Sequence, residues 1–551
     1  MTKHPIELEV NQVNCFYNYT AGLEAMEVDL LKTAVKLLKS GLARTVCFSD
    51  FKSAYLDTKG AVQVEWIQPQ GRQWDTSWVG KFGAGLPPHV TEDLIFCLEL
   101  SFHEFRIQGT GAKHMPPYLR APLPPLVLER DGDILPIRPW LKLYADGIFT
   151  LSYQLDAKWE GLDEPAFIED VVNFYQRYFD RIWVQAHIQR LESEQVLPKA
   201  FEDELSLGGQ RLGGRLVRRL LKEMRGGNRR VLDESLGKNG KTFEIGGESW
   251  ELHPIAGSED QENWEATFEL CRSLYANAVA STVVPHKKKR HQSFPRVTLW
   301  QGRPSISLLR FNGQPDTKNE LIERFSPSIS RVLMRSPTLS GPPRLPPDLR
   351  VFNDYCFHGN RALLLWTWLR PSHAPDDAWA DTCTRMHVLE NQARSEHLEY
   401  HNFRVARACA ITAAPPTDDH LMAAYEILAS AETVVHHASQ FGEVTDALEY
   451  MFDVTGTSRV ISVGKEQARW YLDERRYQVE KDRSRLDRWL TVMLGFVGTA
   501  ALANLVTLPM LRNLYPGLGD VQAGLAALFL ASGAVVVLAI AISMRNRWRQ
   551  A

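Results

Sequence analysis

Two stretches near the C-terminus decide the architecture: Trp489–Leu508 (WLTVMLGFVGTAALANLVTL) and Ala523–Met544 (AGLAALFLASGAVVVLAIAISM). They are 20 and 22 residues long and contain no Asp, Glu, Lys, Arg or His. Because an α-helix rises about 1.5 Å per residue, each stretch is long enough to cross a hydrocarbon core of about 30 Å. We therefore predict two transmembrane helices that follow a large water-soluble part. The alternative is a pair of helices buried in a soluble core.

Basic residues flank this pair of apolar stretches on their outer sides. The segment 475–488 and the tail 545–549 are rich in Arg and Lys, whereas the loop 509–522 has only Arg512. Because basic segments stay on the cytoplasmic side, we expect a multi-pass protein of the inner (cytoplasmic) membrane with both termini in the cytoplasm. The first residues, MTKHPIELEV, contain no apolar run of signal-peptide length, so insertion is expected to depend on the two spans.

The composition of the remaining chain predicts a cytosolic body without a nucleic-acid role. The net charge is −3, and the seven cysteines are scattered without C-x-x-C spacing. We predict an α+β cytosolic part, then a long-helix stalk and the two C-terminal transmembrane helices. The expected divisions are an N-terminal α/β domain at 1–250, a second mixed region with Pro-rich linkers at 251–375, a helical stalk at 376–488 and the transmembrane hairpin with its basic tail at 489–551.

Short alternating or apolar runs predict strands in the first two of these regions. Proline-rich segments at Met115–Leu128 and Pro337–Pro347 predict loops or linkers. The predicted strands are Ile6–Val10, Ala43–Cys47, Val62–Ile67, Ile95–Leu100, Gly147–Tyr153, Val297–Trp300 and Ser305–Phe311.

Longer periodic segments predict helices, and they dominate from about Asp376 onward. The last of them contains no proline before Pro509 and continues into the first span. The predicted helices are Leu23–Leu38, Glu164–Leu191, Thr382–Ala413, Asp418–Met451 and Ser458–Leu508.

A seven-residue repeat of apolar or small side chains connects the stalk to the first span. It runs through Leu472, Val479, Leu486 and Met493, and such a repeat keeps one face of a helix toward a common axis. An amide in lipid is costly unless it faces protein or water, which favours the same face as a pore wall. The alternatives are that this face only holds a static oligomer together, or packs on the second span. The candidate pore-lining residues are Met493, Val497, Ala500, Asn504 and Thr507.

This layout resembles the CorA superfamily of divalent-cation channels, in which a long cytosolic helix becomes the first span and a basic tail follows the second. The resemblance is carried by residues 380–551. It implies a homo-oligomer, a pentamer by analogy, with the first span lining the pore and a divalent cation such as magnesium as cargo. The Gly-Met-Asn motif of that family is missing here: the matching region reads Thr507-Leu508-Pro509-Met510-Leu511-Arg512-Asn513. Its absence and the positive Arg512 argue against magnesium selectivity.

Two basic clusters are candidates for binding an anionic small molecule, because dense Arg and Lys bind phosphates. The first lies within Arg211–Arg230, and the second is the run HKKKRH at His286–His291. The alternative is a solvated surface or loop. The candidate ligand-binding residues are Arg215, Arg218, Arg219, Lys222, Lys287, Lys288, Lys289 and Arg290.

Three further patterns are weaker. GKNGKT at Gly237–Thr242 lacks the first glycine of a phosphate loop, because position 235 is Ser, and predicts a turn. His397 and His401 lie one helical turn apart and could bind a metal, with a solvated helix face as the alternative. The acidic helix Asp418–Met451 could bind a divalent cation between subunits or be an ordinary surface helix.

No catalytic set of side chains emerges from the sequence, so we expect no enzyme. The first hypothesis is an oligomeric, CorA-like ion channel or transporter gated by its cytosolic part, with the lipid bilayer, other copies of the chain and a possible anionic ligand as partners. The alternative is a membrane effector, in stress or antiviral defence, that senses a nucleotide-like ligand and permeabilises the membrane without selective ion transport.

Overall fold

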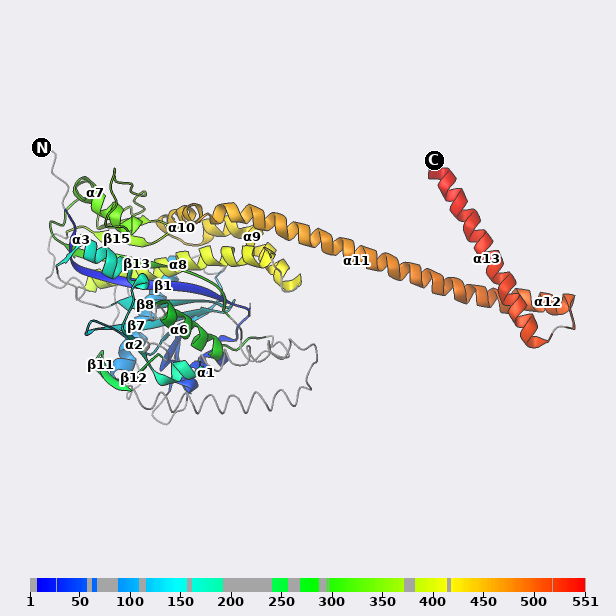
Figure 1. Ribbon diagram of the computed structural model, residues 1–551, viewed down its shortest axis with the longest axis horizontal. Coiled ribbons are helices and arrows are strands. Elements are labelled where there is room, and N and C mark those ends of the chain that lie inside the picture. The colour runs from blue at the N-terminus through cyan, green and yellow to red at the C-terminus, as the bar shows by residue number, and fades with distance from the viewer. Residues whose placement is uncertain are drawn as a thin grey trace. The chain divides into compact units, whose positions relative to one another are not determined.

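The computed structural model divides into two compact units, Met1–Lys465 and Glu466–Ala551, and each is described here by itself (Figure 1). The residues that the structure describes are 7–25, 27–56, 62–66, 88–108, 115–155, 161–191, 240–255, 268–286, 295, 297–370, 382–413, 418–517 and 519–550.

The N-terminal unit is built on one sheet that is almost wholly antiparallel. In the described residues it has 15 strands, and its main path runs β11-β12-β10-β6-β7-β8-β1-β13-β15-β14, with β13 and β15 parallel. The strands are β1 Glu9–Leu23, β2 Thr45–Phe48, β3 Lys52–Leu56, β4 Val62–Trp66, β5 Tyr118–Pro122, β6 Leu126–Arg130, β7 Asp133–Tyr144, β8 Ile148–Leu155, β9 Leu162–Asp163, β10 Arg181–Val184, β11 Lys241–Ile245, β12 Glu248–Pro254, β13 Val297–Phe311, β14 Tyr355–Gly359 and β15 Leu364–Trp368.

Helices cover both faces of this sheet and make up the C-terminal unit. Short π- and 3-10-helical turns at Phe167–Val172 and Phe174–Gln176 complete the N-terminal unit. The α-helices are α1 Leu30–Ser40, α2 Pro88–Gln108, α3 Glu164–Ala166, α6 Phe268–Thr282, α7 Lys318–Met334, α8 Thr382–Ala413, α9 Asp418–His437, α10 Gly442–Thr455, α11 Thr457–Leu502, α12 Leu508–Leu514 and α13 Asp520–Gln550.

The broad prediction of a sheet-containing α/β part followed by long helices and two apolar C-terminal helices is confirmed. The helix predicted at Thr382–Ala413 has the bounds of α8, and the alternating run Gly147–Tyr153 lies in β8. The predicted division at residue 250 falls inside β12, and strands from both sides of it join the same sheet.

Several local predictions were wrong because contacts with distant parts of the chain, and not the local sequence pattern, decided the secondary structure. The apolar run Ile95–Leu100 belongs to α2, since a short apolar run fits a buried helix as well as a strand. The helix predicted at Glu164–Leu191 forms only short helical stretches, and between them β10 pairs with β6. The proline-rich segment Met115–Leu128 contains β5 and part of β6.

Element boundaries also moved. The predicted helix Leu23–Leu38 begins later, after the N-cap residue Asp29, because the chain up to Leu23 is part of the long strand β1. The predicted helix Asp418–Met451 is split into α9 and α10, because Ser439 caps a turn by accepting the backbone N–H of Phe441. The two strands predicted within 297–311 are the single strand β13.

One face of the sheet is apolar and carries the main core. Strand alternation turns Tyr17 and Tyr19 of β1 and Tyr153 of β8 toward this face, where α6 lies across β1 and β13. The ring of Phe268, at the start of α6, lies 4.8 Å from that of Tyr153, edge to face. The Tyr17 hydroxyl donates to the carbonyl of Val171, so the polar atom of this buried ring is satisfied.

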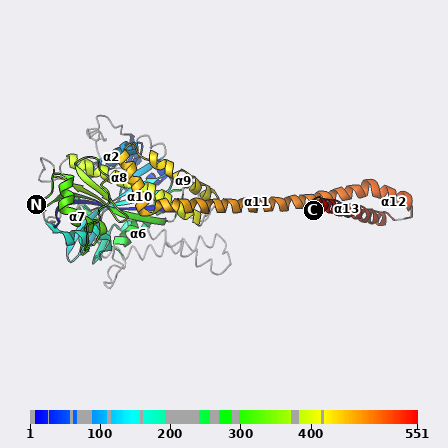
Figure 2. The same cartoon turned by 90° about the horizontal axis from the view of Figure 1, so that it is seen from above.

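The opposite face of the sheet carries polar residues beside apolar ones such as Phe16 and Trp140, and it is buried under α8 and α2 (Figure 2). The same alternation turns polar residues of several strands toward α8, which itself contributes both polar and apolar buried residues. Buried polar residues of this face include Asn14, Asn18, Thr20, Arg120, Lys142, Thr150, Ser152, Gln154, Arg303, Ser305 and Ser307.

Two buried carboxylates and two buried cations form the centre of this interface. Lys142 Nζ lies 2.9 Å from Glu104 Oε2 of α2, and Arg120 Nη1 lies 2.6 Å from Glu396 Oε2 of α8. All four side chains are at most 4% exposed. Burial alone would raise the pKa of Glu104, but the neighbouring cations, Lys142 foremost, lower it below its usual value. The cluster therefore holds α2 and α8 on the sheet as ion pairs.

Hydrogen bonds extend the ionic centre along α8. The amide of Gln392 donates to Asn18 Oδ1 at 2.8 Å and to Ser152 Oγ at 3.2 Å. Two turns later, Arg303 Nε of β13 lies 2.5 Å from Glu399 Oε1. Because these partners come from strands β1, β8 and β13, they define the position of α8 across three neighbouring strands.

Lys142→Met should destabilise the chain by about 3–5 kcal/mol, because it leaves a buried carboxylate without its cation. Lys52→Met is the matched control: Lys52 Nζ lies 2.6 Å from Asp50, but both side chains are about half exposed. Its cost should stay within about 1 kcal/mol. Equilibrium denaturation of the detergent-solubilised chain measures both values, and equal costs would contradict the ionic account of this interface.

Candidate functional site

Helix α10 is fixed at its start by a carboxylate that two buried arginines share. Glu443, in the first turn of α10, lies 3.1 Å from Arg394 Nη1 of α8 and 3.1 Å from Arg350 Nη1. All three side chains are less than one-tenth exposed. Because charge-assisted hydrogen bonds between buried partners are the strong ones, α10 is tied to α8 here.

The junction between α10 and α11 is tied to the same helix. Gly456, in the left-handed conformation with φ +77°, ends α10 and lets α11 begin directly after it. The hydroxyls of Thr455 and Thr457 donate to Asn402 Oδ1 of α8 at 3.0 and 2.6 Å. The start of α11 is thereby bonded to α8. The buried ion pairs hold the same helix on the sheet.

Gly464 permits close packing of the first turns of α11. A Cβ atom added at this glycine would lie 2.9 Å from Leu428 of α9 and 3.1 Å from the sulfur of Cys409 of α8. A larger residue would therefore push α11 away from α8 and α9. Up to Lys465, α11 belongs to the N-terminal unit, and from Glu466 the same continuous helix belongs to the C-terminal unit.

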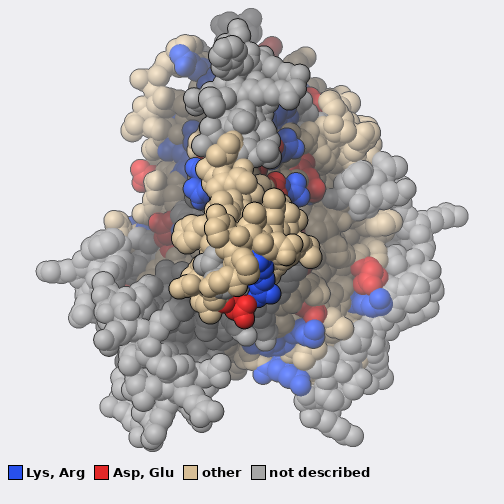
Figure 3. All heavy atoms as spheres, turned by 90° about the vertical axis from the view of Figure 1, so that its right-hand side faces the viewer, with Lys and Arg blue, Asp and Glu red and all other residues tan. Residues whose placement is uncertain are grey.

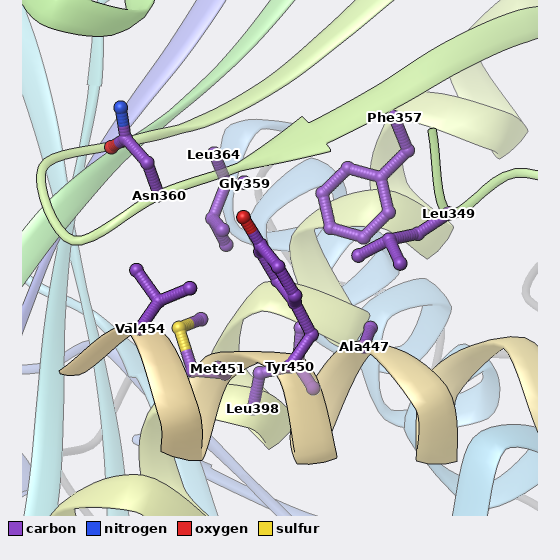
Figure 4. A pocket seen from close by; sticks show the side chains of 10 residues that line it. All are labelled: Leu349, Phe357, Gly359, Asn360, Leu364, Leu398, Ala447, Tyr450, Met451 and Val454. Atoms are coloured by element: carbon purple, nitrogen blue, oxygen red, sulfur yellow. The ribbon is translucent and has the colours of Figure 1, made fainter. Parts of the chain in front are cut away.

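A small apolar pocket of about 220 Å³ lies between α10 and the β14–β15 hairpin (Figure 4). Tyr450 and Met451 of α10 face Phe357 and Leu364 of the hairpin across it, and Leu398 of α8 lies at its base. Its lining is apolar except for Asn360 and the hydroxyl of Tyr450.

The histidine pair on α8 is buried, so the alternative prediction of a solvated helix face is wrong. His397 Nδ1 lies 3.2 Å from Glu104 Oε1, and Nε2 lies 2.9 Å from the carbonyl of Ala438, between α9 and α10. Burial lowers the pKa of His401 well below its usual value. Within the described part of the chain, no group of three or more His, Cys, Asp or Glu side chains is arranged to hold a metal.

Two segments could cross a membrane by length and composition: Thr457–Leu514, which lies in the C-terminal unit from Glu466 onward, and Asp520–Val537. Only 6% of the most apolar window of the first segment is buried inside the chain, unlike a core helix of a soluble protein. The space-filling view shows few charged side chains on the part of this unit that faces the viewer (Figure 3). These helices are thus candidates for membrane insertion.

The two helices of this hairpin touch through small residues. Ala523, Ala527 and Ala531 recur every four positions on α13 and are at most 2% exposed. Ala527 and Ala531 pack in one cluster with Ala503, which directly follows α11. Small residues at this spacing let helix backbones approach closely in a membrane.

Gly495 and Gly498, small residues of the first span, are not contact positions within the described hairpin. A Cβ atom added at either glycine would meet no other atom within 4 Å. Thr499, the next residue along α11, is buried and donates its hydroxyl to the carbonyl of Gly495 at 2.6 Å. The close approach of the two helices is therefore made by alanines and not by these glycines.

The five predicted pore-lining residues fall into two groups. Met493 and Val497 are 63% and 64% exposed, Asn504 is exposed, and Ala500 is half-buried. Thr507 instead donates to the carbonyl of Ala503 at 2.9 Å and lies 3.3 Å from the carbonyl of Ala527 on α13. The hairpin therefore covers Thr507 and leaves Met493, Val497 and Asn504 exposed, as it does most side chains of this span.

Asn504 lies in a π-helical turn, Ala503–Thr507, that the sequence analysis did not predict. π-turns widen a helix by one residue and often mark functional positions. Pro509, which has no backbone N–H to donate, follows shortly after and is the one sequence signal for this irregularity. Among the residues that the structure describes, the Asn504 amide has no hydrogen-bond partner.

All eight candidate ligand-binding residues of the two basic clusters lie outside the described residues. Of the GKNGKT motif, the described part leads into strand β11 and not into a helix, as expected for a turn. Arg512 in the loop of the hairpin is paired with Asp520 at 2.6 Å.

Ala527→Leu should destabilise the hairpin by about 1–3 kcal/mol, because the added atoms have no space against Ala503. Ala534→Leu, at an exposed position of the same helix, is the control and should have little effect. SDS-induced unfolding, followed by energy transfer between dyes on α11 and α13, measures the difference. Equal stabilities of the two variants would rule out this contact.

Comparison with known proteins gives no family assignment: no protein-family model, no curated protein and no solved structure matches this chain.

Proposed function

We propose that the chain is a subunit of an oligomeric membrane channel, in which α11 lines the conduit and the N-terminal unit regulates it. The observation that carries this proposal is the position of Asn504. Its amide sits on an apolar helix, exposed and without a partner among the described residues. A polar group at membrane depth is costly unless it faces protein or water, which favours a site facing other copies of α11 around water.

The neighbouring residues support a pore wall on the same side. Met493 and Val497 precede Asn504 by eleven and seven residues, close to three and two helical turns. The contact with α13 uses Ala503 and Thr507 and leaves Met493, Val497 and Asn504 exposed. Two spans in one chain cannot enclose a conduit, so the proposal requires several copies, as in the CorA superfamily. Met493 and Val497 would then form an apolar neck that gates by dewetting.

No ion is assigned to this conduit. Arg512 alone would favour anions at the mouth, but its pairing with Asp520 cancels that charge within the loop. The basic segments outside the two spans favour an orientation with both termini in the cytoplasm. We expect regulation to act through α8, whose position is fixed by its buried ion pairs. This helix contacts the start of α11 through the hydrogen bond to Thr457 and through the close packing at Gly464.

Val497→Ser should raise the ion leak of proteoliposomes several-fold, because the serine hydroxyl hydrates the apolar neck. Serine is used because inserting it into the membrane costs much less free energy than inserting a charged residue. Phe496→Ser is the matched control on an adjacent face, where the side chain is 70% exposed. Its leak should equal that of the unmodified chain. The measurement is the decay of a set ion gradient, with a large trapped dye as a second readout.

Two outcomes would contradict the channel. In one, neither serine variant changes ion flux while cross-linking shows the chain to be oligomeric. In the other, the large dye escapes together with the ions, which would instead indicate general disruption of the membrane.

A further inference from the structure

A cavity of about 490 Å³ lies beside α6, on the apolar face of the sheet and away from α8. Small side chains create the space, because Ala21 of β1 and Ala276 of α6 both line it. All its lining residues belong to the N-terminal unit, so the site does not depend on whether the hairpin conducts ions.

The walls of this cavity combine aromatic rings with a few polar groups. Tyr19 of β1 and Phe149 of β8 supply the rings, together with the aliphatic Leu151. Both rings are nearly inaccessible from outside, at 7% and 0% exposure. Such a lining favours a flat aromatic ligand over an aliphatic chain, because aromatic rings stack or pack edge to face.

The polar groups that matter for recognition come from α6. Arg272 is 7% exposed, and its guanidinium carbon lies 4.8 Å from the centre of the Tyr19 ring. It pairs with Glu269 in the preceding turn, whose side chain is 57% exposed. Ser273 is exposed and Asn277 is half-buried, so the cavity opens to solvent beside them. A ligand that enters here meets a cation, a hydroxyl and an amide.

We propose that this cavity binds a planar heteroaromatic molecule that carries an acidic group, a chemistry shared by nucleotides and aromatic carboxylates. The ring packs between Tyr19 and Phe149. The amide of Asn277 bonds to donors or acceptors in the plane of the ring, since an amide offers both. The acidic group interacts with the positive charge of Arg272 at the open end.

The test is calorimetric titration of the full-length chain in detergent with AMP, adenosine and indole-3-carboxylate. Either AMP or the indole acid should bind, and the preferred one identifies the source. If AMP is preferred, adenosine should bind about tenfold more weakly, because a hydrogen bond to a charged group contributes about 1.5–3 kcal/mol.

Two variants place the ligand in this cavity. Arg272→Gln should weaken binding of the acidic ligand about tenfold or more, while Arg181→Gln, at an exposed position of β10, should not change it. Ala276→Leu should abolish binding by filling the cavity without loss of the cooperative thermal unfolding transition. The proposal is overturned if neither acidic ligand binds at millimolar concentration, or if binding survives both Arg272→Gln and Ala276→Leu in chains that remain folded.

Discussion

The interaction on which the N-terminal unit depends is the buried pairing of Glu104 and Glu396 with Lys142 and Arg120. Two carboxylates and two cations away from water are tolerated only when each keeps its partners, because an unpaired buried charge costs several kcal/mol. Sliding α8 by one turn along the sheet would separate Glu396 from both cations. The ionic centre therefore selects one position for α8 among the many that a purely apolar interface would allow.

The position of α8 has consequences for the elements that follow it in the chain. Arg394 of α8 binds the start of α10 through Glu443, and Asn402 of α8 binds the two threonines on either side of the junction between α10 and α11. His397 adds a contact to the connection between α9 and α10 through the carbonyl of Ala438. A change in the polar interface would thus act on α11 through short, direct contacts within one unit, as the proposed regulation of a channel requires.

Much of this organisation could be predicted from the sequence, and the failures have physical causes. Uncharged stretches of about 20 residues identify the two C-terminal helices, and strict alternation identifies β8. Alternation cannot reveal what covers the polar side of a strand, so the burial of Lys142 and Ser152 could not be predicted. For the same reason, the polar sequence of α8 did not show that its histidines are buried against other elements. Only the tertiary structure shows that one polar surface covers the other. In the hairpin, the repeat of side chains grouped Thr507 with Met493 and Val497 and did not predict its contact with α13, because a π-turn shifts the register of a helix by one residue.

The most direct test of the central claim is the water accessibility of position 504 in a bilayer. Six of the seven cysteines are buried, so Cys383→Ser gives a suitable background for thiol labelling. In that background, Asn504→Cys should react with a charged, membrane-impermeant thiol reagent and lose ion flux, whereas Leu505→Cys, on the adjacent face, should not react. Equal protection of both positions would show that Asn504 faces no water-filled conduit and would contradict the channel.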